Sequence, residues 1–139
     1  MIMKFENTVK MLMKSAKEKG ASSAKLIPAK DIFVEDYVRL KCKFGCIWFG
    51  KRFTCPPYSP TPNETRKILR SYSKALLIEF TGLRDREGQS EVNEIMYELE
   101  REAFLNGLHK TFAYVAGPCR VCETCPAESV ENPSEFSST

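Results

Sequence analysis

Apolar residues near the start of the chain recur at the spacing of an amphipathic helix. They stand at positions i, i+4, i+7 and i+11, and they are Phe5, Val9, Leu12 and Ala16. Gly20 follows at a place where a glycine commonly ends a helix. The pattern therefore predicts a helix that ends near Gly20, and residues 24–27 then predict a short strand.

A second helix is predicted from the residues at its start. Thr61 precedes Pro62, and Glu64 stands three residues after Thr61. Threonine and glutamate at this spacing form a capping box, and proline is favoured at the first helical position. We therefore expect a helix to begin at Pro62.

Two apolar runs lie on either side of a third helical pattern. Residues 75–80 (ALLIEF) and 111–116 (TFAYVA) predict buried strands. Between them the helical period continues over residues 92–103, with Ser90 as the expected N-cap and Gly107 at the expected end. A strand, a helix and a strand in this order predict a parallel βαβ unit.

Together these elements predict an α/β fold. We expect a small sandwich in which a short, mostly buried sheet is flanked by about three helices, with two cysteine-rich loops at its rim. Residues 41–60 lack any apolar period and are expected to form an irregular loop that something else must hold. One cysteine-rich domain is expected at residues 1–126, followed by a loose polar tail at residues 127–139.

The composition is ordinary for a globular domain apart from its cysteines. The 139 residues are 42% apolar and 28% charged, and the net charge is +3. No apolar run approaches the roughly 20 residues of a membrane helix, and residues 1–20 lack the features of a secretory signal. We therefore expect a cytoplasmic protein without membrane association, in which six cysteines favour metal or redox chemistry over disulfides.

The cysteines fall into two groups of three. The first cysteine segment carries Cys42, Cys46 and Cys55, and the second carries Cys119, Cys122 and Cys125. The C-x2-C-x2-C spacing of the second segment lets one tight loop present three thiolates to a metal. Both segments lie in predicted loops and not on core faces, so a metal site is favoured over buried apolar cysteines. The domain at residues 1–126 is thus expected to bind metal.

The spacing leaves the number of metal sites open. Iron–sulfur clusters and structural zinc sites usually take four ligands, and the second segment offers three. One cluster can take three thiolates from one segment and one from the other. Alternatively, the first segment holds one site with a non-cysteine ligand, and the second segment belongs to another site.

An iron–sulfur cluster, of the 4Fe-4S type, is favoured over zinc as the cofactor. The C-x2-C-x2-C run and the cysteine followed by proline are typical of iron–sulfur ligation, whereas neither segment has two C-x2-C pairs in the arrangement usual for zinc. Five cations and no acid occur between Tyr37 and Asn63. Their charge would offset the negative charge of thiolates around either metal.

Other functions have weaker support in the sequence. Basic residues interleaved with aromatic ones, from Lys41 to Tyr58, can form a nucleic-acid surface, but such aromatics more often pack a loop onto the core. The single histidine, His109, is expected to be a surface or packing residue. The sequence contains no catalytic triad, paired-carboxylate motif or nucleotide fingerprint, so it assigns no reaction.

Longer stretches of the sequence resemble a known family. They are LIP at residues 26–28, KCKFGC at 41–46, GKRFTCPPYSPTP at 50–62, EREAFLNG at 100–107 and GPCRVCETCP at 117–126. Together they are similar to the predicted metal-binding proteins catalogued as domain of unknown function 2284. The resemblance implies a metal held by cysteines and supplies no reaction.

The resemblance also implies a further cysteine several residues after the second segment. In this chain Val130 stands in the comparable stretch. The fourth ligand of the second segment is therefore expected from the first segment or from an exogenous group.

These observations lead to one hypothesis and one alternative. The hypothesis is a metal-binding protein that holds an iron–sulfur cluster through both cysteine segments, with an electron-transfer or accessory role for a redox enzyme. The alternative is a structural zinc protein that acts as a protein-binding or nucleic-acid-binding module.

Overall fold

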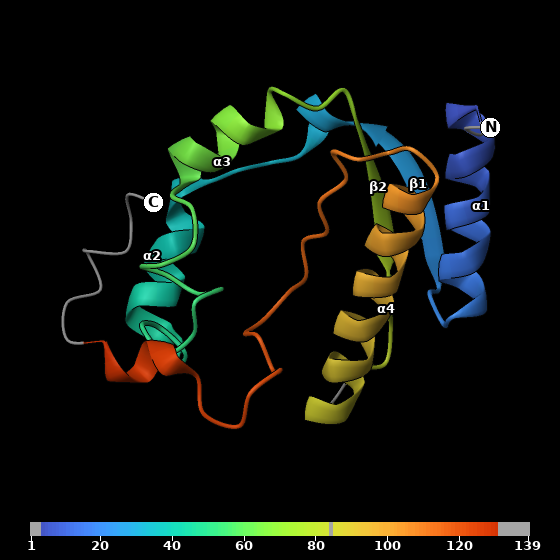
Figure 1. Cartoon of the computed structure of the whole chain (residues 1–139). Coiled ribbons are helices and arrows are strands. Elements are labelled where there is room, and N and C mark those ends of the chain that lie inside the picture. Colours follow the sequence, from blue (N-terminus) through green and yellow to red (C-terminus); the bar gives the residue numbers. More distant parts are fainter. Residues whose placement is uncertain (1–3, 84, 131–139) are drawn as a thin grey trace. The chain divides into compact units, whose positions relative to one another are not determined.

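The computed structural model describes residues 4–83 and 85–130 (Figure 1). The α-helices are α1 (Phe5–Glu18), α2 (Asp36–Gly45), α3 (Pro62–Leu69) and α4 (Arg86–Leu105). The strands are β1 (Ser23–Pro28) and β2 (Lys74–Glu79), and the 3₁₀ helices are η1 (Ala29–Asp31) and η2 (Pro126–Ser129). The described residues thus form a mixed helix and sheet structure, in agreement with the predicted α/β class, with four α-helices in place of about three.

The chain divides into two compact units. The first, here called the helix–sheet unit, comprises Met1–Ile27 and Lys74–Ala116. The second, here called the cysteine unit, comprises Pro28–Ser73 and Gly117–Thr139. All six cysteines belong to the cysteine unit. The single domain expected at residues 1–126 stays a prediction.

The sheet has two strands, β1 and β2, which run antiparallel. At one end of the pairing, the Ser22 N–H donates to the Glu79 carbonyl at 2.8 Å. The predicted parallel βαβ unit is therefore wrong, because β2 pairs in the antiparallel sense with β1, from which a long connection separates it in the sequence. The predicted sandwich is not observed among the described residues.

Residues 111–116 do not form the predicted strand. This segment runs back along α4 (Figure 1). Polar side chains of α4 bind its backbone. The Ala113 N–H donates to the Glu100 carboxylate at 2.7 Å, and the Gln89 side chain donates to the Ala116 carbonyl at 2.7 Å. The segment has the composition of a strand, but side chains of a helix take the place of a neighbouring strand.

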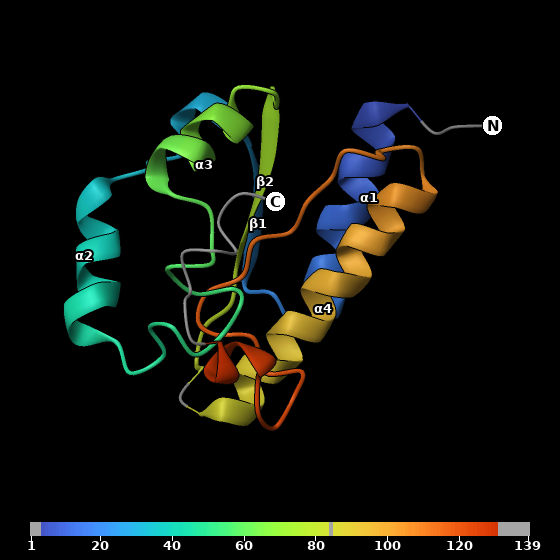
Figure 2. The ribbon, with the colours of Figure 1, turned by 60° about the vertical axis from the view of Figure 1, so that its left-hand side comes forward.

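The core of the helix–sheet unit lies between α1, α4 and one face of the sheet. Figure 2 shows the two helices side by side on the same face. The buried members of the core are Leu12, Ala16, Ala21, Leu99 and Ala103. Leu76 and Ile78 of β2 pack against them, whereas Leu77, which points the other way, is 59% exposed. The sequence predicts that both faces of the strand at residues 75–80 are covered, but in β2 only one face is covered.

The helix starts agree with the capping residues that the sequence predicts, with one exception. The capping box of α3 is confirmed, since the Glu64 N–H donates to Thr61 Oγ1 at 3.2 Å and the Thr61 N–H donates to Glu64 Oε2 at 2.7 Å. The expected N-cap at Ser90 is wrong. Helix α4 begins one turn earlier, after Asp85, whose carboxylate accepts from the Gly88 N–H at 2.8 Å.

The cysteine unit is tied together by two arginines. Arg39 of α2 donates to the carbonyls of Pro60 at 3.0 Å and of Ser59 at 3.4 Å, and Arg66 of α3 forms an ion pair with Asp36 at 2.8 Å. Helix α2 extends to Gly45 and includes Cys42, so the start of the loop predicted at residues 41–60 is helical. The remainder of that loop consists of successive turns.

Replacement of Leu99 by alanine is expected to destabilise the helix–sheet unit by about 2–5 kcal/mol, because Leu99 is 5% exposed in its core. Leu105→Ala is the matched control on the same helix, since Leu105 is 65% exposed and its loss is expected to cost about 0.5 kcal/mol or less. Hydrogen exchange of α4 measures both. Equal effects of the two substitutions would contradict this packing.

No helix within residues 4–83 and 85–130 is both long and apolar enough to cross a bilayer.

Candidate metal centre

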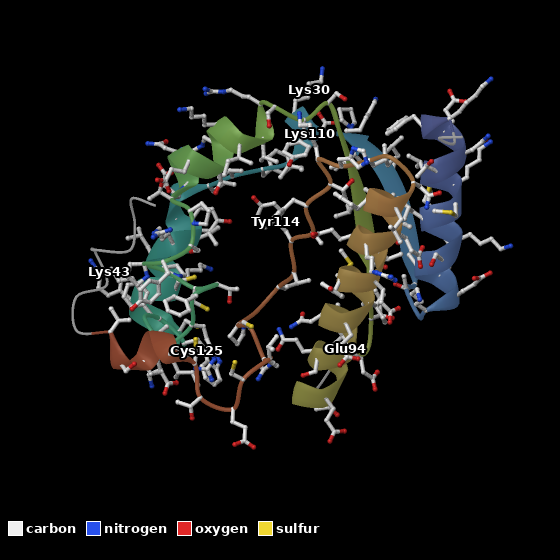
Figure 3. The ribbon with its side chains drawn as sticks, in the orientation of Figure 1. Lys30, Lys43, Glu94, Lys110, Tyr114 and Cys125 are labelled. Atoms are coloured by element: carbon white, nitrogen blue, oxygen red, sulfur yellow. The ribbon has the colours of Figure 1, made fainter. Side chains whose placement is uncertain are left out.

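The six cysteines differ in their exposure. Cys46 and Cys122 are exposed, and Cys125 is buried at the start of η2 (Figure 3). The others are half-buried, and they are Cys42, Cys55 and Cys119. All six are free thiols, so each is available as a ligand.

The thiols of the first segment lie in one neighbourhood. Burial is the largest influence on the Cys55 thiol and raises its pKa, and the nearby Cys46 and Cys42 thiols raise it further. A metal cation would reverse this effect, because it stabilises the thiolate form. A half-buried thiol with two further thiols nearby is the kind of group that a bound cation stabilises.

Cys55 lies where two successive turns meet. The Cys55 N–H donates to the Arg52 carbonyl at 3.0 Å, and the Cys55 carbonyl accepts from the Tyr58 N–H at 3.0 Å. The next residues along the chain are held to α2 by Arg39. The position of Cys55 is therefore fixed by backbone contacts on both sides of it.

Thr54 joins the two cysteine segments. Its side-chain oxygen accepts a hydrogen bond from the Cys119 N–H at 3.0 Å. The Thr54 side chain also acts to lower the pKa of the adjacent Cys55 thiol, against the larger effect of burial. The residue next to the last cysteine of the first segment thus binds the first cysteine of the second.

Two further contacts join the same parts of the chain. Arg52 Nη1 donates to Glu128 Oε1 at 2.6 Å, and the Tyr58 hydroxyl donates to the Ala127 carbonyl at 3.3 Å. Glu128 and Ala127 directly follow the second segment. Segments that are far apart in the sequence are thereby brought together within one unit, which the spacing of the cysteines alone left open.

The thiols do not yet form a coordination sphere. Within residues 4–83 and 85–130, no three or more His, Cys, Asp or Glu side chains are gathered closely enough to hold a metal ion. The donor set nevertheless fits a thiophilic metal, since it consists of free thiols in loops joined by hydrogen bonds. Metal binding commonly completes the folding of such sites, because the ligands converge as the metal binds.

The cysteine unit has little apolar core of its own. Among its described residues, the buried apolar side chains are small, and the buried long side chain is that of Arg52, which is 4% exposed. The small ones include Ala29, Cys125 and Ala127. Units of roughly 70 residues rarely gain enough stability from the core alone and commonly use a metal or disulfides. This packing favours a metal as the missing cross-link.

Sequence reasoning missed the polar residues that join the segments. Thr54, Arg52 and Glu128 have no spacing signal, because their partners lie far away in the sequence. Glu128 falls in the tail predicted to be loose, yet it pairs with Arg52, and Ala127 is 1% exposed. The rest of that predicted tail, residues 131–139, lies outside the described residues.

The basic residues of the first segment are partly used inside the unit. Arg52 is buried over the Trp48 ring, with its guanidinium carbon 4.6 Å from the ring centroid. Phe53 and Tyr58 pack edge to face at 5.1 Å. Trp48, Phe53 and Tyr58 therefore make packing contacts within the loop, and the expectation about nucleic acid stays a prediction. In the other unit, His109 packs against the Phe104 ring at 5.0 Å.

Comparison with known proteins adds one finding. A family model described as "Predicted metal-binding protein (DUF2284)" matches residues 25–138. The matched range includes all six cysteines and most of the chain. Neither the curated proteins nor the solved structures gave a match.

Proposed function

We propose, from the premise that this chain belongs to the DUF2284 family of predicted metal-binding proteins, that it holds one metal centre built from both cysteine segments. The observation that carries the proposal is the hydrogen bond from the Cys119 N–H to the side chain of Thr54, the residue next to Cys55, which joins the two segments within the cysteine unit. The centre would draw its ligands from Cys42, Cys46, Cys55, Cys119, Cys122 and Cys125.

The metal is proposed to be an iron–sulfur cluster of the 4Fe-4S type. An all-cysteine donor set and the C-x2-C-x2-C loop support this choice. Such a cluster takes four thiolates, and Cys55 is the first-segment cysteine that Thr54 ties to the second segment. A cluster of this kind, when bound, would carry an electron.

The residues around the thiols would support that role. Arg52 and Arg120 place positive charge near the Trp48 ring, 4.6 and 5.8 Å from its centroid, and such charge favours a reduced, more negative centre. Cys46 and Cys122 are exposed, so the centre would lie near the surface. An electron-transfer or accessory role beside a redox enzyme is the function that these features support best.

The absorbance spectrum of anaerobically purified protein tests the choice of metal. We expect a brown protein with a broad visible band that dithionite bleaches. A colourless protein with stoichiometric zinc would instead make it a structural zinc module, and its partner would then be sought among proteins or nucleic acids. A metal-free protein that folds normally would contradict both forms of the proposal.

A further inference from the structure

Arg52 is a buried cation whose hydrogen-bonding groups are only partly used. Its side chain is 5% exposed, and its Nη1 atom donates to Glu128 Oε1 at 2.6 Å and to the Lys51 carbonyl at 2.8 Å. Its Nε atom is also buried and has no hydrogen-bond partner among the described residues. Buried N–H groups without a partner are rare in native proteins, and each requires an explanation such as an ion.

Arg52 connects the turns that hold the two cysteine segments. Its carbonyl accepts from the Cys55 N–H at 3.0 Å, so Arg52 and Cys55 share one turn. Its ion-pair partner, Glu128, donates its own N–H to the Cys125 carbonyl at 3.0 Å, so these two share another. The guanidinium group is therefore anchored by residues on both sides of the candidate centre.

The charge around Arg52 suits an anionic partner. Arg52 and Arg120 both lie over the Trp48 ring. Glu128 forms an ion pair with Arg52. Arginine stays protonated at any ordinary pH, so the buried Nε–H remains a charged donor. The Arg52 charge also acts to lower the pKa of Cys55, although burial has the larger and opposite effect. A metal-bound thiolate is the anion that this unit itself supplies.

We propose that the Arg52 Nε–H group donates a hydrogen bond to a thiolate sulfur of the metal centre and makes Arg52 a positioning residue that tunes it. The proposal rests on the proposed function only in requiring a metal held by these thiols. Hydrogen bonds to ligand sulfur stabilise negative charge there, and they tune the reduction potential of the metal.

Three substitutions separate the hydrogen bond from the charge and from the ion pair. Arg52→Lys keeps the positive charge but places a methylene group where Nε was. Arg52→Gln removes the charge but places an amide N–H at that position. Glu128→Gln weakens the bridge to the second segment and leaves the Arg52 side chain intact.

The test uses cobalt(II) as a probe that any four-thiolate site can bind. The full chain, reduced and handled anaerobically, is titrated with cobalt(II), and the thiolate-to-cobalt charge-transfer band is recorded. We expect Arg52→Lys to move this band to longer wavelength, because a thiolate without the hydrogen bond gives up charge more readily. Glu128→Gln is expected to keep the wild-type position. Arg52→Gln, which loses the charge but keeps a donor, is expected to move the band less than Arg52→Lys.

The native iron form gives a second measurement. Loss of the hydrogen bond in Arg52→Lys is expected to lower the midpoint potential of the centre. A tenfold change in the redox equilibrium constant corresponds to about 59 mV for a one-electron couple. A structural role for Arg52 alone would change metal occupancy without moving the potential.

Each outcome supports or overturns the proposal. A band that stays in place in Arg52→Lys, or that moves equally in Glu128→Gln, overturns the hydrogen bond. If Arg52→Lys does not bind cobalt, Arg52→Gln is compared with Arg52→Leu, which has neither the charge nor the donor. A larger displacement of the band in Arg52→Leu supports the proposal, and an equal displacement overturns it. Wild-type protein that takes up no cobalt overturns the proposed function as well, so the two failures are distinguishable.

Discussion

Removal of the metal is expected to unfold the cysteine unit and to leave the helix–sheet unit folded. The described part of the cysteine unit buries little apolar surface, whereas α1 and α4 share a core with the sheet that needs no metal. Hydrogen exchange before and after chelation measures this difference. Protection of α2 and α3 is expected to fall at least about a hundredfold, which corresponds to about 2.7 kcal/mol.

The helix–sheet unit serves as the internal control of that experiment. Peptides from α1 and α4 are expected to exchange at nearly the same rate with and without metal, since their contacts include the Lys19–Glu98 ion pair at 2.7 Å and the Leu12–Leu99 core. Loss of protection in both units to the same extent would show that they fold as one. Unchanged protection everywhere would show that the metal is not structural.

Single cysteine substitutions are expected to remove the same metal from either segment. If one centre takes ligands from both segments, Cys55→Ser and Cys122→Ser should each abolish most of the iron and sulfide. The double variant should then lose little more than either single variant, because both act on one site. Metal content per chain, measured by elemental analysis, gives the comparison.

Thr124→Ser is the matched control, because Thr124 is exposed in the same loop between Cys122 and Cys125 and has no thiol. It is expected to retain wild-type metal content. Two independent centres would give a different pattern, in which each single substitution removes about half of the metal and the double variant removes the rest. That pattern would rule out the shared centre.

Local signals predicted several helix ends well. The Thr61–Glu64 capping box and the glycine ends at Gly20 and Gly107 depend on neighbouring residues alone, and each is observed. Helix α4 begins earlier than the sequence predicts, because Gly88 lies in its first turn and glycine disfavours helices. The Asp85 carboxylate overcomes that preference by accepting from the Gly88 N–H.

Strand pairing depended on contacts that sequence order does not reveal. The run at residues 111–116 has the apolar and β-branched residues of a strand, but Glu100 and Gln89 of α4 bind its backbone. The true partner of β2 is β1, and residues 29–73, which form most of the cysteine unit, separate the two strands in the sequence. Hydrogen bonds from side chains of α4 therefore replace the strand pairing that the sequence predicts for residues 111–116.

The candidate ligands were readable from spacing, whereas their grouping was not. The C-x2-C-x2-C run identifies Cys119, Cys122 and Cys125 as one group without any structure. Their neighbourhood with Cys55 depends on Thr54 and on the Arg52–Glu128 ion pair, which are long-range contacts of ordinary residue types. Such contacts leave no periodic signal in the sequence.

Parallel assays of iron, zinc and acid-labile sulfide on the anaerobically purified protein test most directly the proposed iron–sulfur centre held by the two cysteine segments. We expect iron and sulfide in nearly equal amounts, close to four of each per chain for a 4Fe-4S cluster. Zinc without sulfide would contradict the choice of metal, and the absence of both metals from folded protein would contradict the metal centre itself.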